Sequence, residues 1–393
     1  MNILKKALWS FLIFFILLNL VIIFSGKTYL YKGFVNTYML GRSGPSISEY
    51  HIFSNRTVEA TNPEPWKYRW ERGENAKHGV LQMNEGDVKT LDSIQTVAFL
   101  VANSKELLFE KYFEPYSPDS ITNSFSAAKS IVGLLVGKAL EEGHIKSLDQ
   151  TAGYFIPSMN EEGKQMITIR HLLTMSSGLN WSESGKNPIS DNAEAYYGTN
   201  LKRQIDRLEI IDEPGQNFVY LSGNTQILGM ILTEATGMPL AEYAQTRLWS
   251  QIGAESDALW NLDYEDGFEK AYCCFYATAR DFARIGKLIN QKGAWNGEQL
   301  FPEEYIEEML TPADLRDGLS DNQRYGYQWW VERYMGMDVY YARGILGQYI
   351  ISIPDKDLVI VRTGHTRMKE NDRGHPEDLY IYIDIAMDLI YGF

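Results

Sequence analysis

The chain has 393 residues, of which 45% are hydrophobic and 22% are charged. This composition is typical of a folded globular protein and excludes collagen-like, low-complexity and disordered classes. With 37 Lys and Arg against 51 Asp and Glu, the formal net charge is −14. An acidic protein repels phosphate backbones, so nucleic acid is not expected as a partner.

An apolar run near the N-terminus predicts one helix long enough to cross a membrane. The run, residues 7–24, reads ALWSFLIFFILLNLVIIF, and at about 1.5 Å per residue it spans roughly 27 Å. Lys5 and Lys6 precede it, which favours a cytoplasmic N-terminus and an exported body. An uncleaved anchor is preferred to a cleaved signal peptide, because Ile23-Phe24-Ser25 is a poor cleavage site. The body is therefore expected to be periplasmic or extracellular, and secreted if the segment is cleaved.

Three segments are predicted along the chain. Residues 1–25 form the membrane anchor or signal segment, 26–90 form an irregular extension or linker, and 91–393 form the main domain. That domain opens with strand patterns at Thr96–Ala102 and Leu107–Phe113, separated by a polar turn. The two strands are expected to form a hairpin.

Helical patterns dominate the middle of the domain, and strand patterns return near its end. An apolar helix is predicted over Ser126–Glu142, ending at Gly143. Further helices are predicted at Ile167–Met175, Thr225–Thr236, Leu240–Ile252, Ala279–Asn290 and Glu377–Ile390. Late strands are predicted at Trp329–Arg333, Asp338–Ala342, Tyr349–Ile353 and Leu358–Arg362. The sequence therefore predicts an α+β fold, with an antiparallel sheet built from N- and C-terminal strands, flanking helices and an inserted, mostly helical lobe.

A serine and a lysine stand three residues apart at the start of the first helix, in Ser126-Ala127-Ala128-Lys129. This spacing on a helix places the hydroxyl and the amine on one face, within reach of each other. A serine in the first turn also lies near free N–H groups, which favour developing negative charge. The stretch Ile131–Gly137 is apolar on every face. A lysine at the start of such a buried helix is unfavourable unless it has a structural or catalytic role. The alternative is a helix-capping serine with a snorkelling lysine.

A second candidate motif is Tyr220-Leu221-Ser222, which follows Pro214-Gly215 and leads into another apolar helix. A tyrosine held against a Ser–Lys pair can serve as a phenolate base or a proton relay. In isolation, a core tyrosine is the more ordinary interpretation. The motif gains weight only beside the first one.

Taken together, these patterns resemble the superfamily of class C β-lactamases and serine esterases, which includes penicillin-binding peptidases and nylon-oligomer hydrolases. The resemblance spans roughly residues 90–390. The stretches that carry it, in order, are Phe125–Ser130, Ile169–Leu179, Pro214–Tyr220 and Ala277–Gly286. It implies a β-lactamase/transpeptidase-like fold.

The resemblance also implies roles for the residues at matching positions. Ser126 is the nucleophile, Lys129 its partner base, and Tyr220 the second base or relay. Ser222 stands where the β-lactamases usually carry Asn, as in esterase-like and nylon-hydrolase-like members. These roles are expectations from the resemblance, beside the chemistry of the residues themselves.

The third family motif departs from the usual pattern of Lys or His, a small residue and Gly, because here it reads Ile345–Gly347. Without a cation, a penicillin-type carboxylate loses a partner, so classical β-lactamase activity is not expected. The strand backbone can still supply an oxyanion donor, the Gln348 N–H beside that of Ser126. Arg343 and Ile345 are candidate substrate contacts, although Arg343 is equally interpreted as a surface charge.

The remaining reactive side chains are expected to be structural. Cys273 and Cys274 are the only cysteines, and as neighbours they provide neither a disulfide framework nor a thiolate zinc site. A buried, reduced pair is expected rather than a bond between them. His171 is expected to pack or hydrogen-bond within a helix, and His365 and His375 to lie in a solvated loop.

The sequence thus predicts an exported serine hydrolase that cleaves an ester or amide bond of a small molecule or short peptide through an acyl-enzyme on Ser126. One alternative is a cell-wall D-Ala peptidase or β-lactamase. Another is a catalytically degenerate, membrane-anchored module that binds peptidoglycan or a protein. No metal-ligand or phosphate-loop pattern is present, so no metal and no cofactor are expected. The expected partners are the substrate and, through the N-terminal helix, a membrane.

Overall fold

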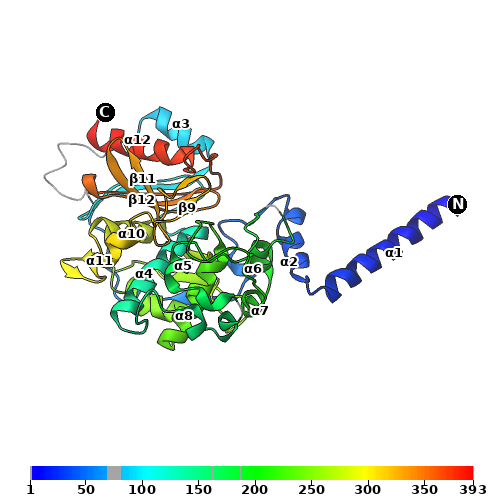
Figure 1. Cartoon of the computed structure of the whole chain (residues 1–393). Helices are drawn as coiled ribbons and strands as arrows, with labels where there is room; N and C mark the ends of the chain where they lie inside the picture. The colour runs from blue at the N-terminus through cyan, green and yellow to red at the C-terminus, as the bar shows by residue number, and fades with distance from the viewer. Residues whose placement is uncertain (1, 69–80, 162, 186, 393) are drawn as a thin grey trace.

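The computed structural model describes residues 2–68, 81–161, 163–185 and 187–392 of the chain. A mixed sheet-and-helix unit with an inserted helical lobe follows a protruding N-terminal helix (Figure 1). The predicted fold class is confirmed. Its helices are α1 Asn2–Phe24, α2 Tyr29–Asn36, α3 Glu85–Ser93, α4 Ala128–Glu141, α5 Ile169–Leu173, α6 Asp191–Tyr197, α7 Leu201–Asp206, α8 Ser222–Thr236, α9 Leu240–Ala244, α10 Ala279–Asn290, α11 Glu303–Met309 and α12 Glu377–Tyr391.

The main sheet is antiparallel throughout and joins the two ends of the body. Its order is β11-β12-β13-β14-β2-β3, so the early strand β2 pairs with the late strand β14, for example Leu100 with Val361. Its strands are β2 Thr96–Ala102, β3 Leu107–Tyr112, β11 Trp330–Tyr334, β12 Met337–Gly344, β13 Gln348–Ile353 and β14 Leu358–Gly364. The predicted strands therefore recur within a few residues of their expected bounds.

Helices cover both faces of this sheet because the strands bury side chains on both sides. On β2, Leu100 belongs to the core shared with the helical lobe, whereas Phe99 and Val101 belong to a second core. In that second core Phe99 lies against Tyr382 of α12, with ring centroids 6.3 Å apart. Figure 1 shows α12 and α3 on one side of the sheet, and α10 and the helical lobe on the other.

The helical lobe contains a second, four-stranded sheet of order β1-β5-β6-β4. Its strands are β1 Asn55–Val58, β4 Thr122–Asn123, β5 Ala258–Asn261 and β6 Phe275–Ala277; short pairs elsewhere are β7 Ala294–Trp295 with β8 Glu298–Gln299 and β9 Arg316–Asp317 with β10 Ser320–Asp321. Strand β4 leads directly into α4, and β6 follows the two cysteines. This small sheet therefore fixes the segments on either side of the Ser–Lys motif.

Helix α4 lies in the middle of the molecule, as its uniformly apolar sequence predicts. Its residues from Ala128 to Gly137 are all buried. Gly137 is required by close packing, because a Cβ there would lie 2.3 Å from the Tyr305 ring. The helix begins two residues later than predicted, after a short 3₁₀ turn at Phe125–Ala127 that contains Ser126.

The segment 26–90 is more regular than expected in its described part, since it contains α2, β1 and α3. Short helices carry a weak periodic signal, and their partners lie far along the chain. Helix α3 did have a readable start, because the Asn84 side chain accepts a hydrogen bond from the Asp87 N–H at 2.8 Å. The helix predicted over Leu240–Ile252 is also interrupted, because α9 gives way to a π-helical turn at Gln245–Trp249.

Helix α1 projects away from the body (Figure 1). Its stretch Ile3–Phe24 has a mean hydropathy of 2.7 and no part of it is buried within the structure. By length and composition it is able to cross a membrane. A four-residue turn then leads to α2, which contacts α6 on the body.

Candidate active site

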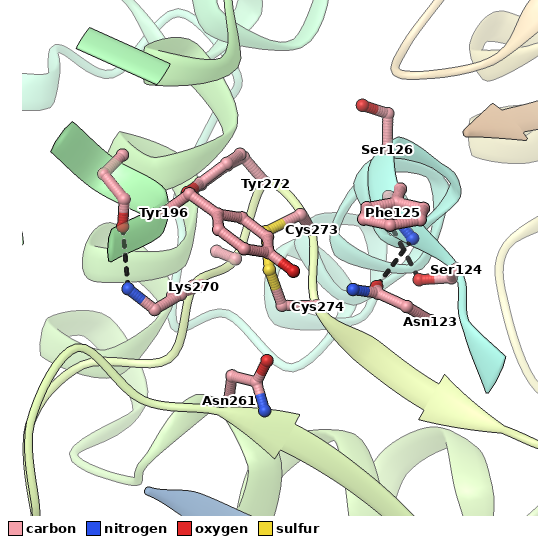
Figure 2. The surroundings of a disulfide bond; sticks show 12 residues. Asn123, Ser124, Phe125, Ser126, Tyr196, Asn261, Lys270, Tyr272, Cys273 and Cys274 are labelled. Atoms are coloured by element: carbon pink, nitrogen blue, oxygen red, sulfur yellow. Dashed lines mark hydrogen bonds between the residues drawn. A yellow bond between two sulfur atoms is a disulfide. The ribbon is translucent and has the colours of Figure 1, made fainter. Parts of the chain in front are cut away.

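The approach to Ser126 is a constrained segment of main chain. Phe125 has a φ of 45°, a left-handed conformation that costs energy for a bulky residue. The Asn123 side chain accepts the Phe125 N–H at 2.8 Å, and the Ser124 N–H donates to the Phe275 carbonyl at 2.9 Å. Figure 2 shows Asn123, Ser124 and Phe125 leading up to Ser126. Side-chain and strand hydrogen bonds therefore stabilise the turn that presents the hydroxyl.

The predicted Ser–Lys pair is assembled at the start of α4. Lys129 Nζ lies 3.1 Å from Ser126 Oγ and donates to it. The same nitrogen donates to the Tyr272 carbonyl oxygen at 2.9 Å. Lys129 is only 1% exposed, whereas Ser126 is half-buried. The amine is thus fixed from behind while the hydroxyl remains reachable, which is the arrangement an activated nucleophile needs.

Tyr220 joins this pair from the other side. The ring of Tyr220 has its centroid 5.1 Å from Lys129 Nζ. Two aromatic side chains support that ring: Tyr325 edge-on at 5.9 Å, and Trp330 tilted at 5.5 Å. The structure therefore brings all three residues assigned to catalysis into one place.

Ser222 lies at the start of α8 and leads to a residue that the sequence did not single out. The Ser222 hydroxyl donates to Glu183 Oε1 at 2.7 Å, and the Ser222 N–H donates to Glu183 Oε2 at 2.6 Å. Asn192 Nδ2 also donates to Glu183, at 2.9 Å. A carboxylate at a helix N-terminus is favoured by the helix dipole. Glu183 thereby fixes Ser222, two positions after Tyr220. No sequence motif around Glu183 indicates this role.

The third motif forms the turn between β12 and β13. Gly344, the last residue of β12, packs so closely on the nucleophile turn that a Cβ there would lie 2.2 Å from the Ser124 carbonyl oxygen. In the β12–β13 ladder Gly344 is opposite Gln348. The end of β12 is therefore the part of the main sheet that touches the segment before Ser126.

Ile345, Gly347 and Gln348, which follow Gly344, have different surroundings. Ile345 is 43% exposed. Gly347 has a φ of 84°, and its carbonyl accepts from Arg362 Nη1 at 2.8 Å. The Gln348 side chain is buried and donates to the Ile345 and Gly364 carbonyls at 3.2 and 2.7 Å. Gly347 and Gln348 thus stabilise the turn from within, and Ile345 is its open member.

Arg343 packs against the ring of Trp330, which separates it from Tyr220. Its guanidinium lies 3.5 Å from the centroid of the Trp330 ring, pairs with Glu370 at 3.1 Å and donates to the Gly374 carbonyl at 3.1 Å. The side chain is 9% exposed. Since Trp330 contacts both Arg343 and Tyr220, the arginine supports the site from outside and is already paired.

The two cysteines form a disulfide, so the expectation of reduced thiols was wrong, although both are buried as expected. Adjacent cysteines need no loop closure to meet. Their closeness outweighed the strain of a bond between neighbours, which was the reason for expecting reduced thiols. The pair directly follows Tyr272 (Figure 2). The Tyr272 carbonyl accepts a hydrogen bond from Lys129 Nζ. Trp260 Nε1 donates to the Cys273 carbonyl at 3.1 Å. The bond therefore lies in the segment that anchors the Lys129 amine.

His171, His365 and His375 each hydrogen-bond within the fold, and one expectation about them was wrong. His171 Nδ1 accepts the Thr168 N–H at 3.3 Å in a capping box, as a hydrogen-bonding role predicts. His375 is buried rather than solvated: it bonds to the Tyr341 hydroxyl at 2.7 Å, and burial lowers its pKa to about 4. His365 is half-buried against Tyr116, and its pKa is lowered by burial. His375 is thus packed on the sheet, while Lys369, Glu370, Asp372 and Arg373 of the same loop face water.

Within the described residues, no group of three or more His, Cys, Asp or Glu side chains is placed to hold a metal ion. The site itself brings together a hydroxyl, an amine and a phenol, from Ser126, Lys129 and Tyr220. These are the groups needed for nucleophilic attack on a carbonyl.

Comparison with known proteins places this geometry in context. The sequence model of the β-lactamase family matches residues 85–381. A 6-aminohexanoate-dimer hydrolase from Paenarthrobacter ureafaciens is 26% identical over 317 residues, covering 76% of this chain and 80% of that protein. The esterase EstB of Burkholderia gladioli is 28% identical over 152 residues, covering 35% of this chain and 38% of the esterase.

Among solved structures, a putative 6-aminohexanoate-dimer hydrolase from Bacillus anthracis superposes with a TM-score of 0.74. It is 24% identical, and the match covers 88% of this chain and 93% of that one. At this level of identity the likeness establishes a common fold. It extends over both the sheet and the helical lobe, including the elements that carry the site.

Proposed function

Because this chain belongs to the β-lactamase family and is a serine hydrolase acting on amide or ester bonds, we propose that Ser126 is its nucleophile and forms an acyl-enzyme. The observation that carries this proposal is the buried contact between Lys129 Nζ and Ser126 Oγ at 3.1 Å. A buried amine aimed at a reachable hydroxyl has a clear use in catalysis and little value in a passive core.

In the first step, Lys129 in its neutral form accepts the Ser126 hydroxyl proton as Oγ attacks the substrate carbonyl carbon. The carbonyl π electrons move to oxygen and give a tetrahedral intermediate. Its collapse breaks the bond to the leaving amine or alcohol, which takes a proton from the Tyr220 hydroxyl, and Lys129 passes the proton it took from Ser126 to Tyr220, so that both groups return to their starting states. The Tyr272 carbonyl keeps the amine oriented throughout by accepting one Nζ–H.

The developing oxyanion is bound by main-chain donors. One is the Ser126 N–H at the mouth of α4. We place the second at the end of β12, where Gly344 contacts the nucleophile turn and the open residue Ile345 follows. This differs from the sequence-based choice of the Gln348 N–H; Gln348 begins β13, where it is the ladder partner of Gly344. Water then attacks the acyl-enzyme, with the same bases removing its proton.

The substrate is proposed to be a small neutral amide or ester rather than a penicillin. The turn at Ile345–Gly347 carries no cation, and the nearby Arg343 is already paired with Glu370. A substrate carboxylate would therefore find no free charged partner in this turn. The relatives named for hydrolysis of the 6-aminohexanoate dimer and of esters fit this substrate class.

We also propose that α1 anchors the protein with its body outside the cytoplasm. The helix is long and apolar enough to span a bilayer, and Lys5 and Lys6 at its start favour retention of that end in the cytoplasm. A cleaved signal peptide is the competing possibility. Mass analysis of the protein recovered from the membrane fraction separates the two.

The nucleophile is tested by the intact mass of the full-length chain in detergent after incubation with a fluorophosphonate. We expect one adduct on the wild type and none on Ser126→Ala. Ser130→Ala is the matched control, because this buried serine of the same helix donates to the Gln328 carbonyl at 2.6 Å and should leave labelling intact. Turnover of Ser126→Ala should fall by about 10⁴ or more.

Labelling of Ser126→Ala, or of none of the three proteins, would contradict the assignment. Two alternative functions are distinguished by further measurements on the same proteins. Rapid nitrocefin hydrolysis or stable acylation by penicillin would support a β-lactamase or cell-wall peptidase. Absence of any acylation together with tight binding of a peptidoglycan fragment would support a non-catalytic binding module.

A further inference from the structure

Helix α2 and the turn after it carry an exposed apolar surface. Tyr31, Phe34, Val35 and Tyr38 are 39%, 56%, 50% and 54% exposed, and their spacing places them on one side of a helix. The rings of Phe34 and Tyr38 lie 6.1 Å apart, which confirms that they share this side. Met39 and Leu40 follow and are 65% and 61% exposed. These six residues are called the α2 apolar face.

The opposite side of α2 is fixed to the body, so the direction of the α2 apolar face is set. Tyr29 and Thr37 are 6% and 4% exposed. Gly33 lies against the ring of Tyr197 in α6, where an added Cβ would be 3.2 Å away. The helix is therefore amphipathic in an unusual sense: one side packs on protein, and large apolar side chains occupy the other. A scattered exposed Leu is ordinary, but a contiguous aromatic group marks an interaction surface.

The position of α2 relative to α1 indicates what covers this surface. The Tyr31 hydroxyl donates to Asn19 Oδ1 of α1 at 2.6 Å. Asn19 lies five residues before Phe24, the end of α1, which corresponds to about 7.5 Å along the helix axis. The Tyr31 side chain of α2 therefore lies beside the last turns of α1. In a bilayer spanned by α1, this is the depth of the boundary between headgroups and acyl chains.

The charge of the segment also fits a lipid surface. No Asp or Glu occurs before Glu49, although the whole chain has a net charge of −14. The basic residues that follow α1, on the same side of the membrane as α2, are Lys27, Lys32 and Arg42, of which Arg42 pairs with Glu49. Aromatic side chains with nearby Lys and Arg are typical of membrane interfaces, where the rings lie at headgroup level and cations attract anionic lipids.

We propose that the α2 apolar face lies in the interfacial layer of a phospholipid bilayer, so that the protein has a second membrane contact besides the spanning helix. Because α2 packs on α6, this contact fixes the orientation of the body, with the α6 side of the helical lobe toward the membrane (Figure 1). The proposal extends the proposed anchoring by α1 and is independent of the hydrolase chemistry.

The test uses the full-length protein in vesicles of phosphatidylcholine and phosphatidylglycerol. Since Cys273 and Cys274 are joined, a cysteine introduced by Phe34→Cys or Tyr38→Cys can be labelled with the fluorophore NBD. Met335→Cys is the matched control, because Met335 is 72% exposed at the β11–β12 turn, in the main sheet away from α2. Emission is then compared with and without lipids carrying a doxyl quencher near the headgroup.

We expect a blue shift and a loss of emission on adding doxyl lipid at positions 34 and 38, and neither at position 335. Quenching at 34 and 38 no greater than at 335 would overturn the proposal. A blue shift without lipid quenching, growing with the number of protein molecules per vesicle, would also overturn it and assign the surface to a second copy of the chain. None of these readouts depends on whether Ser126 is catalytic.

Discussion

A main-chain carbonyl positions the Lys129 side chain, whereas other side chains position Tyr220. Lys129 Nζ is fixed between the Ser126 hydroxyl and the Tyr272 carbonyl. The Tyr220 ring instead packs against the rings of Tyr325 and Trp330. A main-chain anchor survives most substitutions of the residue that provides it. An anchor built from side chains depends on each of them.

The largest expected effect comes from removing the amine itself. Lys129→Met keeps the length of the side chain but deletes the proton acceptor, so kcat/KM should fall by about 10³ or more. Lys270→Met is the matched control, because Lys270 is also buried and donates to a main-chain carbonyl, that of Ala195, at 2.7 Å. Burial lowers the pKa of Lys270 to about 7.

The control should change the midpoint of thermal unfolding while leaving the kinetic constants of the folded enzyme close to wild type. Equal losses of kcat/KM in the two folded variants would show that the Lys129 contact is structural. Steady-state kinetics and thermal melts on the same preparations separate the outcomes.

Removing only a hydroxyl tests the other side. Tyr220→Phe keeps the ring against Trp330 but deletes the proposed relay, so kcat should fall by roughly 10² with an unchanged melting temperature. Tyr325→Phe removes a hydroxyl from the same aromatic cluster and should have little effect on turnover. If Tyr220→Phe retained full activity, the leaving group would have to receive its proton from another group.

A smaller loss is expected where a side chain acts on Tyr220 through the main chain. Glu183→Gln replaces one acceptor of the Ser222 bonds with a donor, and we expect kcat to fall roughly ten-fold as the segment shifts. Ser222→Ala removes one of those hydrogen bonds and leaves the N–H contact, so its loss should be smaller. A change in KM with constant kcat would instead assign Glu183 to substrate binding.

The smallest expected effect concerns the disulfide beside the Lys129 anchor. Replacing both Cys273 and Cys274 with Ala frees the segment that positions the Tyr272 carbonyl, and kcat should fall several-fold. The free energy of unfolding should fall by only about 1 kcal/mol, because a bond between neighbours closes almost no loop. Denaturant unfolding together with kinetics checks both. A large loss of stability with unchanged kcat would contradict the local role.

The same contrast explains what could be predicted from the sequence. The Ser126–Lys129 contact follows from helical spacing, and the strands of the main sheet follow from β-branched apolar runs such as Thr96–Ala102. Both signals are local. The union of early and late strands in one antiparallel sheet also followed from the placement of strands at the two ends of the body.

Contacts between distant parts of the chain could not be predicted. Glu183 meets Ser222 across 39 residues, and the Tyr272 carbonyl meets Lys129 across 143. A carbonyl carries no sequence signal, since every residue has one. Helix α2 was missed for a related reason: its apolar residues face both protein and surroundings, so its sequence lacks the usual polar side.

In the turn that follows Gly344, the main chain is proposed to serve the reaction and the exposed side chain to contact the substrate. At the end of β12 the proposed contribution to the reaction is a main-chain N–H, which is the same for every residue except proline. The Ile345 side chain, 43% exposed, is therefore free to change without disturbing that donor. Position 345 is a natural place to randomise when the aim is to redirect this hydrolase toward bulkier or more polar acyl groups.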